Sequence, residues 1–142
     1  MASPDLMAMA DWELVVRDPR TVAADLDQQG DAVRATIRGP GGRDVRAVLL
    51  RAHGAGELVR GRIYVLTLDV SAAPARTVEV AIREAGGAAR ARLRATPRWS
   101  ARTVHFRLPP GPPASSFALE FALGAASGVF EFDGLSLRLS HL

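Results

Sequence analysis

The sequence predicts an all-β domain, an antiparallel β-sandwich, and three observations support this prediction. The clearest is the segment Arg62–Ala72, in which Tyr64, Leu66, Leu68 and Val70 occupy every second position. Side chains alternate between the two faces of a strand, so this segment presents one continuous apolar face. Alternating segments of the same kind recur along the chain, separated by turn signals roughly every 8–12 residues, as is typical of a sandwich. No segment shows a convincing helical period.

In the first half of the chain, four strands precede the segment just described. Trp12–Val16 is apolar and β-rich, and predicts the first strand. Thr21–Asp27 and Ala32–Arg38 flank the turn-like Gln28–Asp31, which predicts a hairpin with one polar face. Asp44–Ala52 predicts the fourth strand, after a glycine-rich loop.

In the second half, five further segments predict strands by the same alternation. Thr77–Glu84 and Ala89–Thr96 are separated by two glycines, which predicts a turn between them. Thr103–Leu108 is followed by a proline-rich surface loop, and Phe117–Leu123 begins after that loop. Gly128–Leu139 is the last predicted strand.

The last strand changes face partway along its length. Its apolar residues move from even to odd positions at Asp133–Gly134. One extra residue in a strand, a β-bulge, produces such a change, and glycine suits it. The residues concerned are Phe130 and Phe132 before the bulge and Leu135, Leu137 and Leu139 after it.

Length and composition restrict the class of protein. A chain of 142 residues predicts one domain, which we place at residues 11–142, and the absence of cysteine excludes disulfides. No apolar run is long enough for a membrane helix, so no membrane partner is expected. Met1–Ala10 has no periodicity and no secretory signal pattern, and is predicted to be a disordered leader or tag remnant. The protein is then cytoplasmic if the chain is complete, or extracellular if it is an excised module of a secreted protein.

The charged residues do not predict a nucleic-acid partner. All 18 basic residues are arginine, but 15 acidic residues leave a net charge of only +3. Long-range attraction to phosphate is weak at this charge. Arg90, Arg92 and Arg94 share one strand face, which predicts either an anion site or a face salt-bridged to glutamates on neighbouring strands. The latter interpretation is favoured, because no aromatic side chains for base stacking are interleaved with the arginines.

No pattern of catalytic residues is present. The sequence has no nucleophile elbow, phosphate-binding loop or zinc spacing. Glu79, Glu120 and Glu131 occupy outward strand positions, where a glycosidase-like carboxylate pair is conceivable. Ordinary charged strand faces explain them better, so the protein is predicted not to be an enzyme.

Five segments fall in an order that resembles a known family, the jelly-roll carbohydrate-binding modules of families four and nine in the galactose-binding-like superfamily. The resemblance implies a jelly-roll sandwich and a non-catalytic glycan-binding function. It also implies that Tyr64, Trp99, Phe106, Phe121 and Leu137 pack in the core. The five segments are Ala10–Trp12, Gly61–Leu68, Arg98–Phe106, Leu119–Gly124 and Phe132–Leu137.

One departure from the family changes the ligand that is expected. In the family, the strand before the central one commonly begins with a tryptophan followed by polar residues that line the sugar cleft. The matching positions of this chain are Arg43, Asp44, Val45 and Arg46, so an arginine replaces the aromatic residue. A site without that aromatic must rely on charged side chains, which favours acidic or polar glycans. We therefore expect a concave face with an open groove lined by Arg43, Asp44, Arg46, Arg83, Arg92 and Glu131. Members of the family also hold a structural calcium, and Asp133 matches the acidic residue near that ion.

A second function remains open, a structural or assembly domain that kept the sandwich and lost the sugar site. The apolar residues Ile63, Val65 and Val48 are expected at outer positions, where a cover would be needed. A second copy of the chain or another protein would supply that cover.

Overall fold

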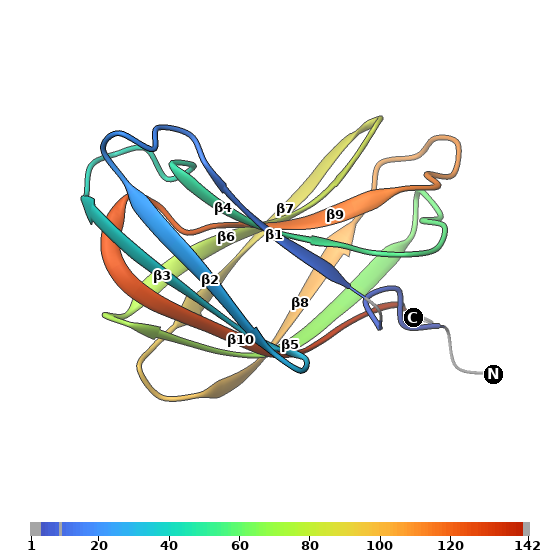
Figure 1. Cartoon of the computed structure of the whole chain (residues 1–142). Helices are drawn as coiled ribbons and strands as arrows, with labels where there is room; N and C mark the ends of the chain where they lie inside the picture. The colour runs from blue at the N-terminus through green and yellow to red at the C-terminus, as the bar shows by residue number, and fades with distance from the viewer. Residues whose placement is uncertain (1–3, 9, 141–142) are drawn as a thin grey trace.

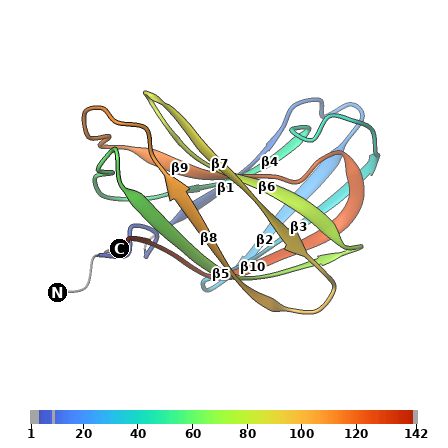
Figure 2. The ribbon, with the colours of Figure 1, turned by 180° about the vertical axis from the view of Figure 1, so that it is seen from behind.

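The chain folds into two antiparallel sheets that pack face to face, as a computed structural model shows (Figures 1 and 2). The structure describes residues 4–8 and 10–140, and these residues contain ten strands. The strands are β1 (Asp11–Val16), β2 (Ala23–Gln29), β3 (Ala32–Pro40), β4 (Val48–His53), β5 (Ile63–Ala73), β6 (Arg76–Glu84), β7 (Gly87–Ala95), β8 (Ser100–Arg107), β9 (Phe117–Ala122) and β10 (Ala126–Leu139).

The strand order confirms the predicted all-β jelly-roll sandwich. Sheet A has the order β1-β4-β9-β6-β7, and sheet B has the order β2-β3-β10-β5-β8. Neighbours in both sheets run antiparallel, and β2 and β3 form the predicted hairpin. Figure 2 shows the loop that joins β7 to β8 and so carries the chain from one sheet to the other. Within the described residues, no helix has the length and apolar character needed to cross a membrane.

The core lies between the sheets and is joined across them by aromatic rings. Phe121 of sheet A and Phe132 of sheet B are fully buried, with ring centroids 4.7 Å apart. Trp12 of β1 packs beside both, 6.4 Å from each centroid. Large aromatic rings bury much apolar surface, so this cluster is a principal contact between the two layers.

The backbone hydrogen bonds test two predictions about local structure, the bulge in the last strand and the start of the fourth strand. The bulge in β10 is confirmed, since its register with β5 shifts between Asp133 and Ser136 and Gly134 has a φ of +62°. The fourth strand begins later than predicted, at Val48 instead of Asp44. Asp44 instead forms a turn, in which its carboxylate accepts the Arg46 N–H at 3.1 Å and its carbonyl the Ala47 N–H at 3.2 Å. Such side-chain bonding to nearby backbone competes with strand pairing.

The prediction of a disordered leader at residues 1–10 is wrong for the part of that segment around Leu6 and Met7. Both side chains are buried in the core cluster. The Leu6 N–H donates to the carbonyl of Leu137 at 2.9 Å, and the Leu137 N–H donates to Oδ1 of Asp5 at 3.0 Å. The segment therefore docks on the end of β10, as Figure 1 shows. Residues 1–3 and 9 lie outside the described residues.

Leu6→Ala is expected to lower the free energy of unfolding by about 2 kcal/mol, because it leaves a gap beside the end of β10. Urea unfolding would measure this loss. Val45→Ala is the control, since Val45 is exposed and its truncation should change stability by less than about 0.5 kcal/mol. Equal effects of the two substitutions would show that the segment does not pack on the domain in solution.

The predicted core is confirmed except at Trp99. Tyr64, Phe106, Phe121 and Leu137 are all buried. Trp99 is 46% exposed, because it lies in the loop after β7 and not on a strand that faces the other sheet.

The expected apolar outer positions are also only partly correct. Ile63 and Val65 lie half-buried on β5. Val48 is fully buried and belongs to the core cluster, since its strand begins there and directs it inward. One of the three positions that were expected to need a cover therefore needs none.

Candidate functional site

The outward side of sheet A brings together charged side chains from several strands. Leu119 and Phe121 of β9 point into the core, so Glu120 between them points to the opposite side of the sheet. Arg51 of β4 lies directly across from Glu120, and Glu13 of β1 lies across from Arg51. Charges of alternating sign therefore cross three adjacent strands on this face.

Glu120 is the centre of this arrangement. Only 2% of its surface is exposed, although its side chain faces outward. Three guanidinium groups cover it. The Oε1 atom accepts from Nη2 of Arg46 at 2.5 Å and from Nε of Arg83 at 2.8 Å. The Oε2 atom accepts from Nε of Arg51 at 2.9 Å. We call these four residues the Glu120 cluster.

The cluster keeps its central carboxylate ionised. Burial alone would raise the pKa of Glu120. The hydrogen bonds from Arg51 and Arg46 and the positive charges of Arg83 and Arg46 outweigh that effect, and the pKa lies below its ordinary value. Glu120 is therefore a fixed negative charge at neutral pH.

The arginines of the cluster remain accessible. The side chains of Arg46, Arg51 and Arg83 are 30%, 34% and 38% exposed. Three guanidinium groups face two carboxylates, Glu120 and, 3.9 Å from Arg51, Glu13, which leaves an excess of one positive charge at this point of the face. Each guanidinium carries five N–H donors, so donors beyond those bound to Glu120 can reach a ligand.

Ion pairs also flank the cluster on both sides. Glu13 contacts Nε2 of His53 at 2.7 Å and lies 3.9 Å from Nη1 of Arg51. On the other side, Arg90 of β7 lies 3.9 Å from Glu79 of β6. These contacts hold the neighbouring charged side chains over sheet A.

The arginines of β7 continue this face to the edge of the sheet. Arg92 lies opposite Glu79 in the register and is exposed, and Nη1 of Arg94 donates to Oγ1 of Thr77 at 3.3 Å. With Arg90, they share one side of the strand as predicted.

Most of the predicted binding residues lie on or beside this face. Arg46 and Arg83 belong to the cluster, and Arg92 lies on β7. Asp44 lies in the turn before β4 and pairs with Arg17 at 3.5 Å, and Arg43 is the exposed residue before it.

Glu131 is separated from these residues. It lies on β10 of sheet B, where it pairs with Arg34 at 3.7 Å. The six predicted residues therefore do not line one groove, because β10 and the strands of sheet A belong to different layers.

The role of Arg51 was not predicted from the sequence, and Glu120 was interpreted as an ordinary surface charge. The alternation of Glu120 with apolar neighbours placed it outward, but no sequence signal showed that it meets Arg51.

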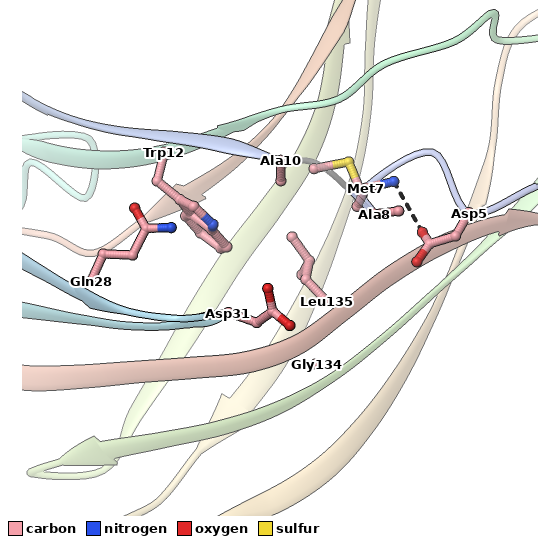
Figure 3. Close-up of a pocket in the computed structure, with 9 residues that line it drawn as sticks. All are labelled: Asp5, Met7, Ala8, Ala10, Trp12, Gln28, Asp31, Gly134 and Leu135. Carbon is pink, nitrogen blue, oxygen red and sulfur yellow. Dashed lines mark hydrogen bonds between the residues drawn. The ribbon is translucent and has the colours of Figure 1, made fainter.

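A hollow of about 420 Å³ opens at the side of the sandwich, away from the Glu120 cluster (Figure 3). Trp12 of β1 and Leu135, which follows the bulge of β10, contribute its apolar lining. No sequence pattern predicted it, because its walls come from parts of the chain far apart in sequence. The lining residues are Asp5, Met7, Ala8, Ala10, Trp12, Gln28, Asp31, Gly134 and Leu135.

The environment of Asp133 does not fit the structural calcium implied by the resemblance. Asp133 lies opposite Asp69 in the register of β10 and β5, and its Oδ1 accepts the Gly134 N–H at 2.8 Å. Calcium takes six to eight oxygen ligands. Among residues 4–8 and 10–140, no group of three or more acidic, histidine or cysteine side chains is placed to hold a metal. We therefore assign no metal-binding role to Asp133.

The fold is shared with solved carbohydrate-binding modules. A family 4 carbohydrate-binding module superposes with a TM-score of 0.73 at 17% identity, covering 91% of this chain and 86% of that one. The N-terminal cellulose-binding domain of Cellulomonas fimi β-1,4-glucanase C gives 0.62 at 17% identity, with 88% and 92% covered. The CBM22-1 xylan-binding domain of Paenibacillus barcinonensis Xyn10C gives 0.62 at 13% identity, with 97% and 96% covered.

Sequence comparison adds no closer relationship. No protein-family model matches the chain, and no curated protein matches it. At identities of 17% and below, the structural similarity establishes the fold, and the resemblance to jelly-roll carbohydrate-binding modules is confirmed at that level. A shared fold does not transfer an activity, so function must be argued from the site.

Proposed function

We propose that this chain is a non-catalytic carbohydrate-binding module and that it binds acidic glycans on the outward side of sheet A. The similarity to carbohydrate-binding modules supports the general function. The observation that carries the proposed site is the burial of Glu120 beneath Arg46, Arg51 and Arg83 on the solvent side of a sheet.

This cluster is better explained by recognition than by stability. Removing charged groups from water costs free energy, and their mutual attraction often does little more than offset that cost. A buried ion network is therefore weak evidence for stabilisation. The network does, however, fix the positions of three guanidinium groups. A surface whose donors are already held in place loses less conformational freedom when a ligand binds.

The chemistry of the cluster favours a carboxylate-bearing sugar. A planar guanidinium can donate two parallel hydrogen bonds to a carboxylate, and its other N–H groups can donate to sugar hydroxyls. The excess positive charge that remains after pairing with Glu120 and Glu13 attracts uronic-acid units more than neutral ones. Arg92 and Arg43, at the margins of the same face, would extend the contact along a chain.

The same geometry argues against glycoside hydrolysis at this face. A glycosidase needs a carboxylic acid with a raised pKa to protonate the leaving group. The pKa of Glu120 is lowered instead, and both of its oxygens accept hydrogen bonds from arginine. Glu131, on the other sheet, cannot supply a second carboxyl group here.

Calorimetric titration with neutral and uronic-acid oligosaccharides, with and without calcium, tests the proposal. Binding of the uronic-acid oligosaccharides is expected, and Arg83→Ala should weaken it about tenfold or more, because a hydrogen bond to a charged group is lost. Arg34→Ala is the matched control, since it removes an arginine from a strand of sheet B and should leave the affinity unchanged.

Two outcomes would contradict the proposal. One is the absence of heat with every oligosaccharide, which would favour the alternative of an assembly domain that contacts another protein or a second copy. The other is an equal loss of affinity in Arg34→Ala and Arg83→Ala, which would place the sugar elsewhere. Calcium should not change the affinity.

A further inference from the structure

The hollow beside Trp12 has the features of a second ligand site. It lies where β1, an edge strand of sheet A, faces the turn between β2 and β3 of sheet B. Figure 3 shows Trp12 and Gln28 on one side, the segment with Asp5 and Met7 on the other, and Leu135 and Asp31 between them. Its volume of about 420 Å³ falls within the range of small-molecule sites, roughly 300–1,000 Å³.

The walls of the hollow are held in place by contacts described above. The Oδ1 atom of Asp5 accepts the N–H groups of Met7 and Leu137, each at 3.0 Å, which fixes this carboxylate against the end of β10. The indole of Trp12 lies at 19° to the ring of Phe121. The β10 bulge changes the alternation of the strand just before Leu135, which is why that residue reaches the hollow. A site built from fixed groups loses little entropy on binding.

The lining combines an apolar surface with hydrogen-bond acceptors. Trp12 and Leu135 supply most of the apolar part, and Met7, only 3% exposed, contributes little surface. Asp5 and Asp31 supply carboxylate oxygens. None of the nine described lining residues is basic, so the hollow carries two negative charges and repels anions.

We propose that this hollow binds an uncharged sugar unit, as a second site independent of the one on sheet A. A pyranose ring has C–H groups that pack on an indole and hydroxyl groups that donate to carboxylates. The side-chain amide of Gln28, whose Nε2 donates to the Gly30 carbonyl at 3.4 Å, adds a further polar group at the rim. The two sites thus have opposite charge preferences, acidic sugar on sheet A and neutral sugar beside Trp12.

The fluorescence of Trp12 tests the proposal directly, because the chain contains only two tryptophans. In the Trp99→Phe variant, Trp12 is the single reporter. Titration with neutral β-1,4-linked glucose and xylose oligosaccharides should change its emission and protect it from quenching by acrylamide. The corresponding uronic-acid oligosaccharide should do neither. In the same background, Asp31→Ala should weaken the neutral-sugar binding about tenfold, since it removes a charged acceptor.

A matched variant separates the two sites. Arg83→Ala, in the Trp99→Phe background, should leave the Trp12 response to neutral sugar unchanged while it weakens uronic-acid binding in calorimetry. The proposal fails if neutral sugars leave the Trp12 emission unchanged, if Asp31→Ala binds within twofold of its parent, or if Arg83→Ala abolishes the response. Gln28→Ala, an exposed position in β2, provides a second rim variant if Asp31→Ala alters the turn.

Discussion

Replacing Glu120 by glutamine is expected to lower the free energy of unfolding by about 3 kcal/mol at pH 7. The substitution keeps the shape of the side chain but removes the charge that Arg46, Arg51 and Arg83 share. Breaking a buried ion pair costs about 3–5 kcal/mol, and the lower end applies because the arginines are partly exposed to water. Urea unfolding at constant pH would measure the loss.

The pH dependence of this effect has a defined sign. The folded pKa of Glu120 lies below its ordinary value of 4.5. Its charge therefore contributes stability that is fully present above that value and is lost as pH falls through the folded pKa. The difference between wild type and Glu120→Gln should be largest at neutral pH and should shrink as the solution becomes acidic below pH 4.5.

The control for this experiment lies on the other sheet. Glu131→Gln removes a carboxylate that pairs with the single Arg34 at 3.7 Å, and should cost about 1 kcal/mol or less. A loss in Glu120→Gln no greater than that of the control, or one that persists unchanged at pH 3, would show that the cluster does not hold a buried charge.

Phe132→Ala is expected to be the most destabilising single truncation in the core, with a loss of about 3–5 kcal/mol. Phe132 has no exposed surface, and its ring contacts Phe121 at 4.7 Å and Trp12 at 6.4 Å between centroids. Its removal would leave a cavity between the two sheets. Urea unfolding, monitored by far-ultraviolet circular dichroism, would measure the shift.

Trp99→Ala provides the contrast, since it truncates a larger aromatic side chain that is 46% exposed. We expect a loss of about 1 kcal/mol, because less apolar surface returns to water. Equal losses of unfolding free energy in the two variants would contradict the difference in burial between Phe132 and Trp99. The loop after β7 would then contribute as much stability as the core between the sheets.

The strands could be predicted from the sequence because each has one face in the core. A predicted segment overlaps each of the ten strands, and most of these segments were found from period-two alternation. The change of parity at Asp133–Gly134 located the bulge. The N-terminal segment was mispredicted because its burial does not arise from an alternating strand. Leu6 and Met7 are buried by contact with distant segments, which leaves no periodic signal.

The site could be predicted only in part, because it depends on strand order. Alternation showed that Glu120 and Arg83 point outward, but it could not show that β4, β9 and β6 are neighbours. The arginines bound to Glu120 lie 37 to 74 residues away in sequence. The same limit explains why Glu131 was grouped with residues of the other sheet. Trp99 was assigned to the core from the family resemblance, although it lies in the loop between β7 and β8.

Because β7 lies at the edge of sheet A, its three arginines also affect how this edge can pair with another molecule. An edge strand exposes unpaired backbone N–H and C=O groups, which can pair with an edge strand of another molecule. Arg90, Arg92 and Arg94 stand at alternate positions along this edge. Two such edges brought together would place like charges side by side. The stripe therefore opposes edge-to-edge aggregation and helps to keep the sandwich a closed unit.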